Sequence, residues 1–190
     1  MVDQDKEEIY EELFISLTHR VFVLEEDGDE RDNYVRHFEG PVLLIRGERE
    51  EETEIGRAEL IYYDGSRAID CGLDIVDIAD SFRQAEYEYA QSMYTEGMLN
   101  QELIGYEMSN DLLAVRSVSI LPEYRSRDYG LRIVRKIAET VGYHCGAVVI
   151  GSNVLAEAGI EPEGVSDNPN ALELQPTKNP TIYCIKRFDG

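Results

Sequence analysis

Residues 115–142 read VRSVSILPEYRSRDYGLRIVRKIAETVG, and this stretch decides the fold class. It begins inside an apolar, β-branched run over 111–121, which predicts a buried strand ending at Pro122. Apolar residues then recur every three or four positions over 131–141. This spacing predicts a helix with Gly142 as its C-cap.

A second buried strand is predicted directly after this helix, at 146–150 (GAVVI). A strand, a loop, a helix and a strand in this order normally form a right-handed crossover between parallel strands. Upstream, strands predicted at 42–46 and 54–63 flank a charged turn at 47–54 and indicate an antiparallel hairpin. The sequence therefore predicts an α/β fold of the α+β kind: a mixed, mostly antiparallel sheet with helices on both faces.

A long amphipathic helix is predicted over 75–93, where apolar residues share one face at helical spacing. Asp74 or Asp77 caps its start and Gly97 ends it. We interpret the apolar stripe as core packing, without a role in cofactor binding. The remaining predictions are strands at 13–17, 20–24 and 181–187, a loop at 25–33, and an extended proline-rich loop at 159–180.

The chain has 190 residues, a length typical of one domain. We expect a single domain over 1–190, with an acidic N-terminal extension at 1–40. The net charge of −21 argues against binding to nucleic acid or to an anionic membrane, since both require clustered Lys and Arg. It favours cationic partners, such as an amine or a basic protein, or serves solubility alone.

Three cysteines occur without a CxxC pair, and they indicate free thiols in a reducing compartment. The three histidines lack metal-ligand spacing, so we expect no metal site. Because the chain shows neither a signal peptide nor an apolar run of about 18 residues, we expect a soluble, cytoplasmic protein.

The loop 122–130 is a candidate anion site. It joins the carboxyl end of a buried strand to a helix start, where unpaired amides and the helix dipole favour a negative ligand. Arg125 and Arg127 add positive charge, and Gly130 would allow the backbone to approach a ligand. Ligands also bind at the carboxyl ends of strands in open α/β sheets.

Residues 111–155 resemble the acyl-CoA-binding core of the GNAT superfamily of N-acyltransferases. In that family a strand is followed by Pro, two residues, the motif Arg/Gln-x-x-Gly-x-Gly/Ala and a helix. Here Pro122 precedes the motif Arg125-Ser126-Arg127-Asp128-Tyr129-Gly130. Asn153, just past the next strand, stands where the family often has an Asn near the cofactor.

The resemblance implies acetyl-CoA as the cofactor and transfer of its acetyl group to an amine of a small molecule or a protein. The backbone of Ser119 and Ile120 would pair with the pantetheine arm, and the amides over 125–130 would bind the pyrophosphate. The implied cofactor-binding residues are Ser119, Ile120, Arg125, Ser126, Arg127, Asp128, Tyr129, Gly130, Leu131 and Asn153.

The sequence departs from the family pattern at the catalytic and pyrophosphate-binding positions. Asp128 stands at the first motif Gly, so its carboxylate either faces the diphosphate or points away and caps the helix. Arg and Ser occupy the strand positions where the family often has an acidic base, and Ile160 stands where it often has a Tyr. We therefore take Glu107 as the candidate base and Tyr183 as the candidate acid.

The sequence is compatible with two functions. The first is an N-acetyltransferase that takes a cationic amine. The alternative is a catalytically inactive GNAT-like binding module that uses its acidic surface for a basic partner. An acidic mimic of DNA is a third idea, and it would require a continuous stripe of carboxylates. The sequence leaves open the acceptor and whether the chain forms a homodimer.

Overall fold

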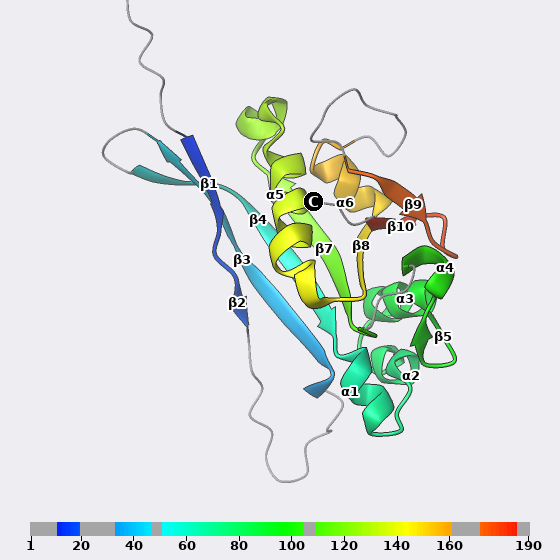
Figure 1. Cartoon of the computed structure of the whole chain (residues 1–190). Helices are drawn as coiled ribbons and strands as arrows, with labels where there is room; N and C mark the ends of the chain where they lie inside the picture. Colours follow the sequence, from blue (N-terminus) through cyan, green and yellow to red (C-terminus); the bar gives the residue numbers. More distant parts are fainter. Residues whose placement is uncertain (1–10, 20–32, 47–50, 105–108, 161–171, 186–190) are drawn as a thin grey trace, which may run out of the picture.

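The computed structural model describes residues 11–19, 33–46, 51–104, 109–160 and 172–185 (Figure 1). They form a curved, eight-stranded sheet in the order β1-β3-β4-β7-β8-β10-β9, with β2 paired to β3. The strands are β1 (Glu11–Ile15), β2 (Thr18–His19), β3 (Val35–Arg46), β4 (Glu51–Tyr63), β7 (Leu112–Ile120), β8 (Ala147–Gly151), β9 (Leu174–Pro176) and β10 (Ile182–Ile185).

Most helices lie in the connection between β4 and β7. That connection holds α1 (Gly65–Asp70), α2 (Ile75–Asp80), α3 (Gln84–Met93), the hairpin of β5 (Tyr94–Thr95) and β6 (Met98–Leu99), and α4 (Gln101–Ile104). The later elements are the 3-10 helix η2 (Pro122–Arg127), α5 (Tyr129–Thr140), the 3-10 turn η3 (Gly142–His144) and α6 (Ser152–Glu157).

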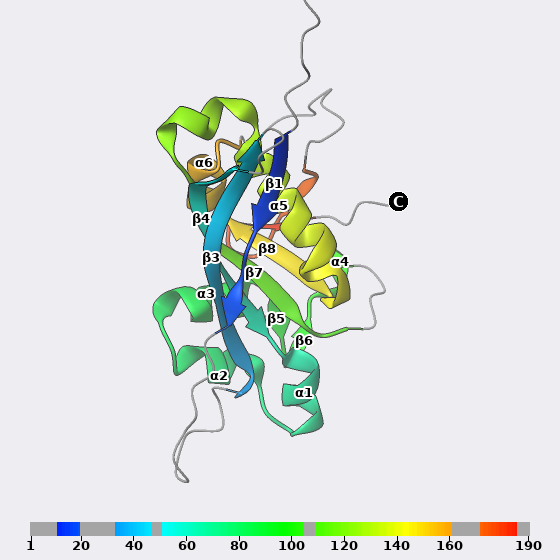
Figure 2. The same cartoon turned by 90° about the vertical axis from the view of Figure 1, so that its left-hand side faces the viewer.

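The helices cover both faces of the sheet, which confirms the predicted fold class (Figure 2). Leu113 and Val115 of β7 belong to a core that includes the apolar side of α5. Leu112 and Ala114, on the alternate face, belong to a second core with α1, α2 and α3. This alternation follows from the two-residue period of a strand.

The pair of β7 and β8 is parallel, as the crossover pattern predicted, and every other neighbouring pair in this sheet is antiparallel. Pairing of β7 with β8 runs from Leu112↔Ala147 to Val115↔Ile150. β8 then ends at Gly151, whereas β7 continues to Ile120 beside β4. We call the place where β7 and β8 part, just beyond Val115 and Ile150, the fork.

A β-bulge lies in β7 at the fork. Glu59 of β4 faces Ser117, and the next residue, Leu60, faces Val115, so Arg116 is an extra residue in β7. A bulge of this kind locally bends the strand and redirects a side chain. Arg116 has no partner on β4, and it lies on the face of Leu112 and Ala114, where its guanidinium approaches Glu86 of α3.

The predicted antiparallel hairpin is confirmed, but both of its strands are longer than expected. β3 passes through Gly40 and Pro41, which the sequence placed before the strand. A Cβ on Gly40 would overlap the carbonyl oxygen of Ser16, so the crossing of the N-terminal chain requires glycine there. The predicted turn 47–54 is wrong over 51–53, which belong to β4, and the strand predicted from Glu54 is confirmed.

The single helix predicted over 75–93 is wrong, because the chain forms two helices there. α2 ends at Ser81, whose hydroxyl donates a 2.6 Å hydrogen bond to the carbonyl oxygen of Ile78. Arg83 is extended and begins α3. Asp74 caps α2 through the Val76 amide, as one of the two predicted caps. The helical stretch ends at Met93, before the β5–β6 hairpin that contains Gly97.

Gly142 is not the C-cap of α5. Val141 occupies that position in right-handed conformation, and Gly142 continues into η3. A Cβ on Gly142 would overlap the Val148 side chain, so this glycine serves close packing. β9 forms within the loop predicted at 159–180.

Several other predictions are only partly covered by the structure. The strand predicted at 20–24 and nearly all of the loop at 25–33 lie outside the described residues. Within 1–40, residues 11–15, 18–19 and 35–40 are strand residues of the main sheet. None of the helices in the described ranges combines the length and apolar character needed to cross a bilayer.

Candidate active site at the fork

The loop after β7 is fixed by two hydrogen bonds at its base. The Leu121 amide donates to the carbonyl oxygen of Ile55 at 2.8 Å. The Arg125 Nε donates to the carbonyl oxygen of Ile120, also at 2.8 Å. Pro122 opens η2, a position that suits its fixed φ and its missing N–H. These contacts hold the start of α5 above the carboxyl end of β7.

Four consecutive main-chain amides, from Asp128 to Leu131, have no hydrogen-bond acceptor within the described residues. They include the first turn of α5, whose positive dipole end favours an anion. Asp128 has φ 55°, in the left-handed region, and its side chain does not cap the helix. Glycine adopts this backbone conformation readily and Asp tolerates it, so the motif geometry is possible with Asp.

Gly130 serves helix packing, which differs from the expected role in ligand approach. A Cβ at this position would overlap the carbonyl oxygen of Ala158, just after α6. Gly130 is also buried. The glycine is therefore required to bring the start of α5 against the end of α6.

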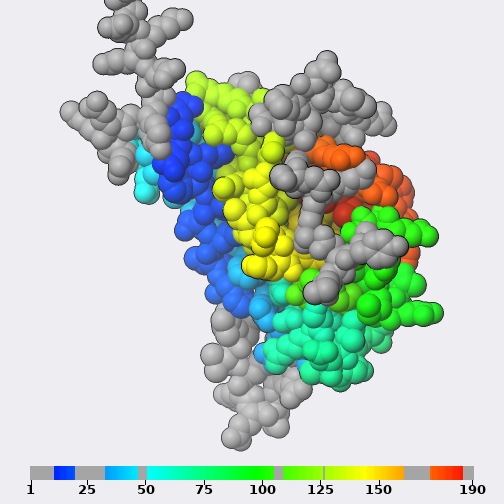
Figure 3. All heavy atoms as spheres, viewed as in Figure 1, coloured from blue at the N-terminus to red at the C-terminus, as the bar shows by residue number. Residues whose placement is uncertain are grey.

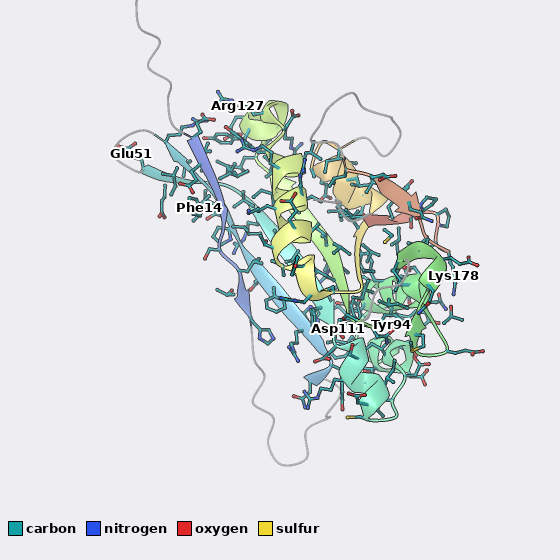
Figure 4. The ribbon with its side chains drawn as sticks, in the orientation of Figure 1. Phe14, Glu51, Tyr94, Asp111, Arg127 and Lys178 are labelled. Carbon is teal, nitrogen blue, oxygen red and sulfur yellow. The ribbon has the colours of Figure 1, made fainter. Side chains whose placement is uncertain are left out.

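Arg127 is engaged away from the unpaired amides. Its Nη1 lies 3.1 Å from Glu11 Oε1 on β1, and the Tyr129 hydroxyl donates to Glu11 Oε2 at 2.8 Å. Arg46 Nε is 2.9 Å from the same carboxylate. Figure 3 shows β1 directly beside α5, and Figure 4 places Arg127 at the end of the molecule opposite Asp111 and Tyr94. Arg127 therefore ties the loop to β1.

The Tyr129 hydrogen bond, together with Arg46 and Arg127, lowers the pKa of Glu11, although partial burial acts in the opposite direction. The carboxylate is thus held in its charged form. The charge of Arg127 was expected to support a pyrophosphate, whereas its side chain is directed toward Glu11 on β1.

A shallow depression of about 320 Å³ lies beside the loop on the β4 side. Arg57 and Arg125 supply positive charge there, against the single carboxylate of Glu54. The Nη atoms of Arg125 form no hydrogen bond within the described residues. The lining residues are Glu54, Gly56, Arg57, Ser119, Ile120, Leu121, Pro122 and Arg125.

Tyr89 of α3 reaches the fork from the opposite face of the sheet. Its hydroxyl donates to the carbonyl oxygen of Val115 at 3.5 Å. A Cβ built on Gly151 would lie 3.1 Å from the same hydroxyl and 2.6 Å from Asn153 Oδ1. Tyr89 and Asn153 therefore meet at Gly151. Burial raises the pKa of Tyr89 to about 12, so the hydroxyl keeps its proton at neutral pH.

Glu86 lies one turn before Tyr89 on α3 and is the most deeply buried carboxylate among the described residues, with 1% exposure. Neither of its oxygens accepts a hydrogen bond from the described residues. Arg116 Nη1 lies 3.8 Å from Glu86 Oε1 and 3.7 Å from Glu59 Oε2. The bulge residue therefore stands between a buried and a half-exposed carboxylate.

His37 of β3 completes this charged cluster. Burial lowers the pKa of His37, and the nearby Arg116 and Arg83 act in the same direction, whereas Glu86 and Glu59 oppose them. The imidazole is therefore neutral at pH 7. We refer to Glu86, Arg116, Glu59, His37 and Tyr89 as the fork cluster.

The structure brings together only part of the set that the sequence singled out. Glu107 lies outside the described residues. Tyr183 lies on β10 and pairs with Ile150 of β8. Its side chain packs on the α5 face of the sheet, away from Tyr89. Ser119 and Ile120 pair with β4, and the Ile120 carbonyl oxygen already accepts from Arg125.

The remaining motif residues stay close to the loop. Leu131 is half-buried in the first turn of α5, and Ser126 lies in η2. No group of three or more His, Cys, Asp or Glu in the described ranges is arranged to hold a metal ion.

Sequence reasoning missed Glu86 and Tyr89 as site residues. Tyr89 lay in the apolar stripe of the predicted helix and was interpreted as core, whereas Glu86 lay in the same predicted helix without an assigned role. The available signal was the position of Glu86, which shares the face of Tyr89, Ala90 and Met93 at helical spacing. A charged residue on a buried face requires an explanation, because an isolated buried charge is costly.

Comparisons with known proteins add no relative: neither a family model, nor a curated protein, nor a solved structure matches this chain.

Proposed function

We propose that this protein is an acyl-CoA-dependent N-acyltransferase that moves an acetyl group to an amine of a small molecule or a protein. One observation carries the proposal: at the start of α5, above the end of β7, the amides of Asp128 to Leu131 find no acceptor in the part of the chain that the structure describes. Such amides, with the helix dipole, favour a phosphate ligand. The resemblance of 111–155 to the GNAT core indicates that coenzyme A is the molecule that carries this phosphate.

The residues present fit a diphosphate in part. The amides over 128–131 would hold it, and the Nη atoms of Arg125, which bond to none of the described residues, would support it. The carboxylate of Asp128 opposes it, and Arg127 is directed to Glu11 instead. When bound, acetyl-CoA supplies an activated acetyl thioester. In the balanced reaction an N–C bond forms, the C–S bond breaks, and one proton passes from the amine to the departing sulfur.

Tyr89 fits the acid requirement of this reaction better than Tyr183. Its hydroxyl lies at the parting of β7 and β8, between Val115 and Gly151. Its raised pKa keeps a proton on Oη at neutral pH. A positioned proton donor contributes typically 10²- to 10⁴-fold to the rate. The Tyr183 side chain packs on the other face of the sheet.

Calorimetric titration of the protein with acetyl-CoA and with coenzyme A tests the proposal. We expect saturable binding and a rise in melting temperature with ligand concentration, since a ligand that binds only the folded state stabilises it. Asp128→Asn and Asp128→Gly form the matched pair. Removal of the carboxylate should tighten binding about tenfold in both variants, by loss of like-charge repulsion.

The exposed carboxylate of Glu123, in the first turn of η2, provides the control. Glu123→Gln should change the affinity much less than Asp128→Asn. Absence of coenzyme A binding by the parent and by both Asp128 variants at millimolar ligand would refute the proposal.

The second candidate is a binding module without catalysis, which uses the acidic surface for a basic protein. It is favoured by the carboxylate of Asp128 among the amides and by the pairing of Arg127 with Glu11. The two candidates differ in one result. An inactive module would bind a basic protein with strong salt dependence and would release no free thiol from acetyl-CoA with any amine.

A further inference from the structure

The buried carboxylate of Glu86 is unusual in its surroundings. With 1% exposure and no hydrogen bond to either oxygen from the described residues, it has only the ion pair to Arg116 at 3.8 Å. A buried charge without hydrogen bonds costs several kcal/mol, and a structural ion pair normally offsets this with close, directed contacts. The Glu86 environment therefore lacks a hydrogen-bond donor that an optimised structural pair would provide.

Arg116 is suited to act as a movable cover over this carboxylate. Its guanidinium stands at 3.7 and 3.8 Å from two carboxylates and hydrogen-bonds to none of the described residues. Its side chain is 28% exposed, and Glu59 is 46% exposed. A cation that displaced the guanidinium would take its place between the buried Glu86 and the half-exposed Glu59.

The cluster lies where an acceptor would meet the acyl donor. Arg116 is the first residue of β7 beyond its pairing with β8, and Tyr89 marks the same point from α3. The unpaired amides at the start of α5 follow the carboxyl end of β7, whereas Arg116 lies at the middle of this strand. A donor held at those amides and an acceptor held at Glu86 would approach the fork from opposite faces.

We infer that Glu86 binds the acceptor amine as a primary ammonium group and then accepts a proton from it. The ammonium group takes the place of the Arg116 guanidinium beside Glu86. The inference rests on the proposed function for its catalytic part. The ammonium group supplies the N–H donors that the Glu86 oxygens lack. A quaternary ammonium has no N–H and does not fit.

The proton transfer balances within the pair. One N–H bond of the ammonium breaks and an O–H bond forms on Glu86, so both charges disappear. The amine nitrogen regains its lone pair, which then forms the N–C bond. The transfer therefore leaves a neutral acid and a neutral amine side by side in the site.

The binding part is tested without any cofactor, by NMR titration with n-butylammonium chloride. The side-chain signals of Arg116 and the ring signals of His37 report on the cluster. We expect saturable shifts in the wild-type protein, loss of saturation in Glu86→Gln, and saturation retained in Glu59→Gln, which removes the exposed partner of the same guanidinium. Tetramethylammonium chloride, at equal ionic strength, should give no saturable shift.

The catalytic part is tested with acetyl-CoA and a panel of primary amines. Glu86→Gln should lower kcat/KM for the amine by about 10²- to 10⁴-fold and leave the calorimetric affinity for acetyl-CoA unchanged. Glu88→Gln, which removes an exposed carboxylate of the same helix outside the fork cluster, should retain activity within a few-fold. Transfer by Glu86→Gln at the wild-type rate would overturn the inference and leave the proposed function standing.

Failure of the proposed function gives a different pattern. In that case the wild-type protein binds no acetyl-CoA, and the butylammonium titration alone decides whether Glu86 is an ammonium site. Absence of saturable shifts in the wild-type protein overturns the inference whatever the cofactor result. If Glu86→Gln does not fold, this wild-type titration with its tetramethylammonium control still decides the binding part.

Discussion

The phenolic hydroxyl of Tyr129 donates a 2.8 Å hydrogen bond to Glu11, and the two residues are 118 positions apart in the chain. Tyr129 is almost fully buried at the start of α5, whereas Glu11 opens the edge strand β1. Arg46 and Arg127 hold the same carboxylate. The motif loop is therefore attached to the far edge of the sheet by one acidic residue.

Replacement of Tyr129 by Phe should destabilise the fold by about 1.5–3 kcal/mol, the usual contribution of a hydrogen bond to a charged group. The ring and its packing remain in this variant. Urea unfolding measures the change. Tyr124→Phe is the control, because the Tyr124 hydroxyl bonds to none of the described residues while its ring also contacts Tyr129. Equal losses in the two variants would contradict the assigned contact.

The stabilisation by Glu11 should depend on pH in the acid range. Its pKa is lowered in the folded state, so the stabilisation is present above the ordinary value of 4.5 and is lost as pH falls through the folded value. The difference in unfolding free energy between wild type and Tyr129→Phe should therefore shrink below pH 4. A difference that stays constant from pH 7 to pH 3 would contradict this linkage.

Gly130→Ala should destabilise the protein by about 1–3 kcal/mol. The added methyl group would overlap the main chain at Ala158, and α5 and α6 could separate only by losing packing contacts. Chemical unfolding measures the loss. Lys136→Ala, on the exposed side of the same helix, should change stability by less than about 0.5 kcal/mol. A neutral Gly130→Ala variant would show that α5 and α6 do not meet as closely as described.

Tyr89 should ionise near pH 12, well above the usual 10 for tyrosine, chiefly because it is buried. Since the raised pKa favours the neutral form in the fold, its contribution to stability is complete below pH 10 and is lost as pH rises toward 12. Carbon-13 NMR of ring-labelled tyrosine, assigned through Tyr89→Phe, measures the ionisation. Half-ionisation near pH 10 would contradict the buried position of this hydroxyl.

The parts of the fold that were predictable are those coded by local pattern. The β-branched run of β7 and the helical spacing of α5 lie within one continuous stretch, and so does the parallel pair they produce. The break between α2 and α3 was not predictable from periodicity, because the apolar stripe continues through Ser81. The strand through Gly40 required the crossing chain at Ser16, which no local pattern shows.

The candidate site shows the same division. The loop over 122–130 was located from its residues, and its unpaired amides follow from its place at a helix start. The direction of Arg127 was not predictable, because its partner Glu11 is 116 residues away. Glu86 and Arg116 lie 30 positions apart, and the packing of α3 on β7 brings them together.

That extra residue has a further consequence for how the strand tolerates length changes. Before Arg116 the odd-numbered residues Leu113 and Val115 face α5, and after it the even-numbered Val118 and Ile120 do so. Deletion of Arg116 would leave an unbroken alternation, in which Leu113, Val115, Val118 and Ile120 stand at every second position and all face α5. The hydroxyls of Ser117 and Ser119 would keep the opposite face, and β7 would pair with β4 without a bulge. The sheet is therefore expected to survive the loss of this one codon, although the cation between Glu86 and Glu59 would be lost with it.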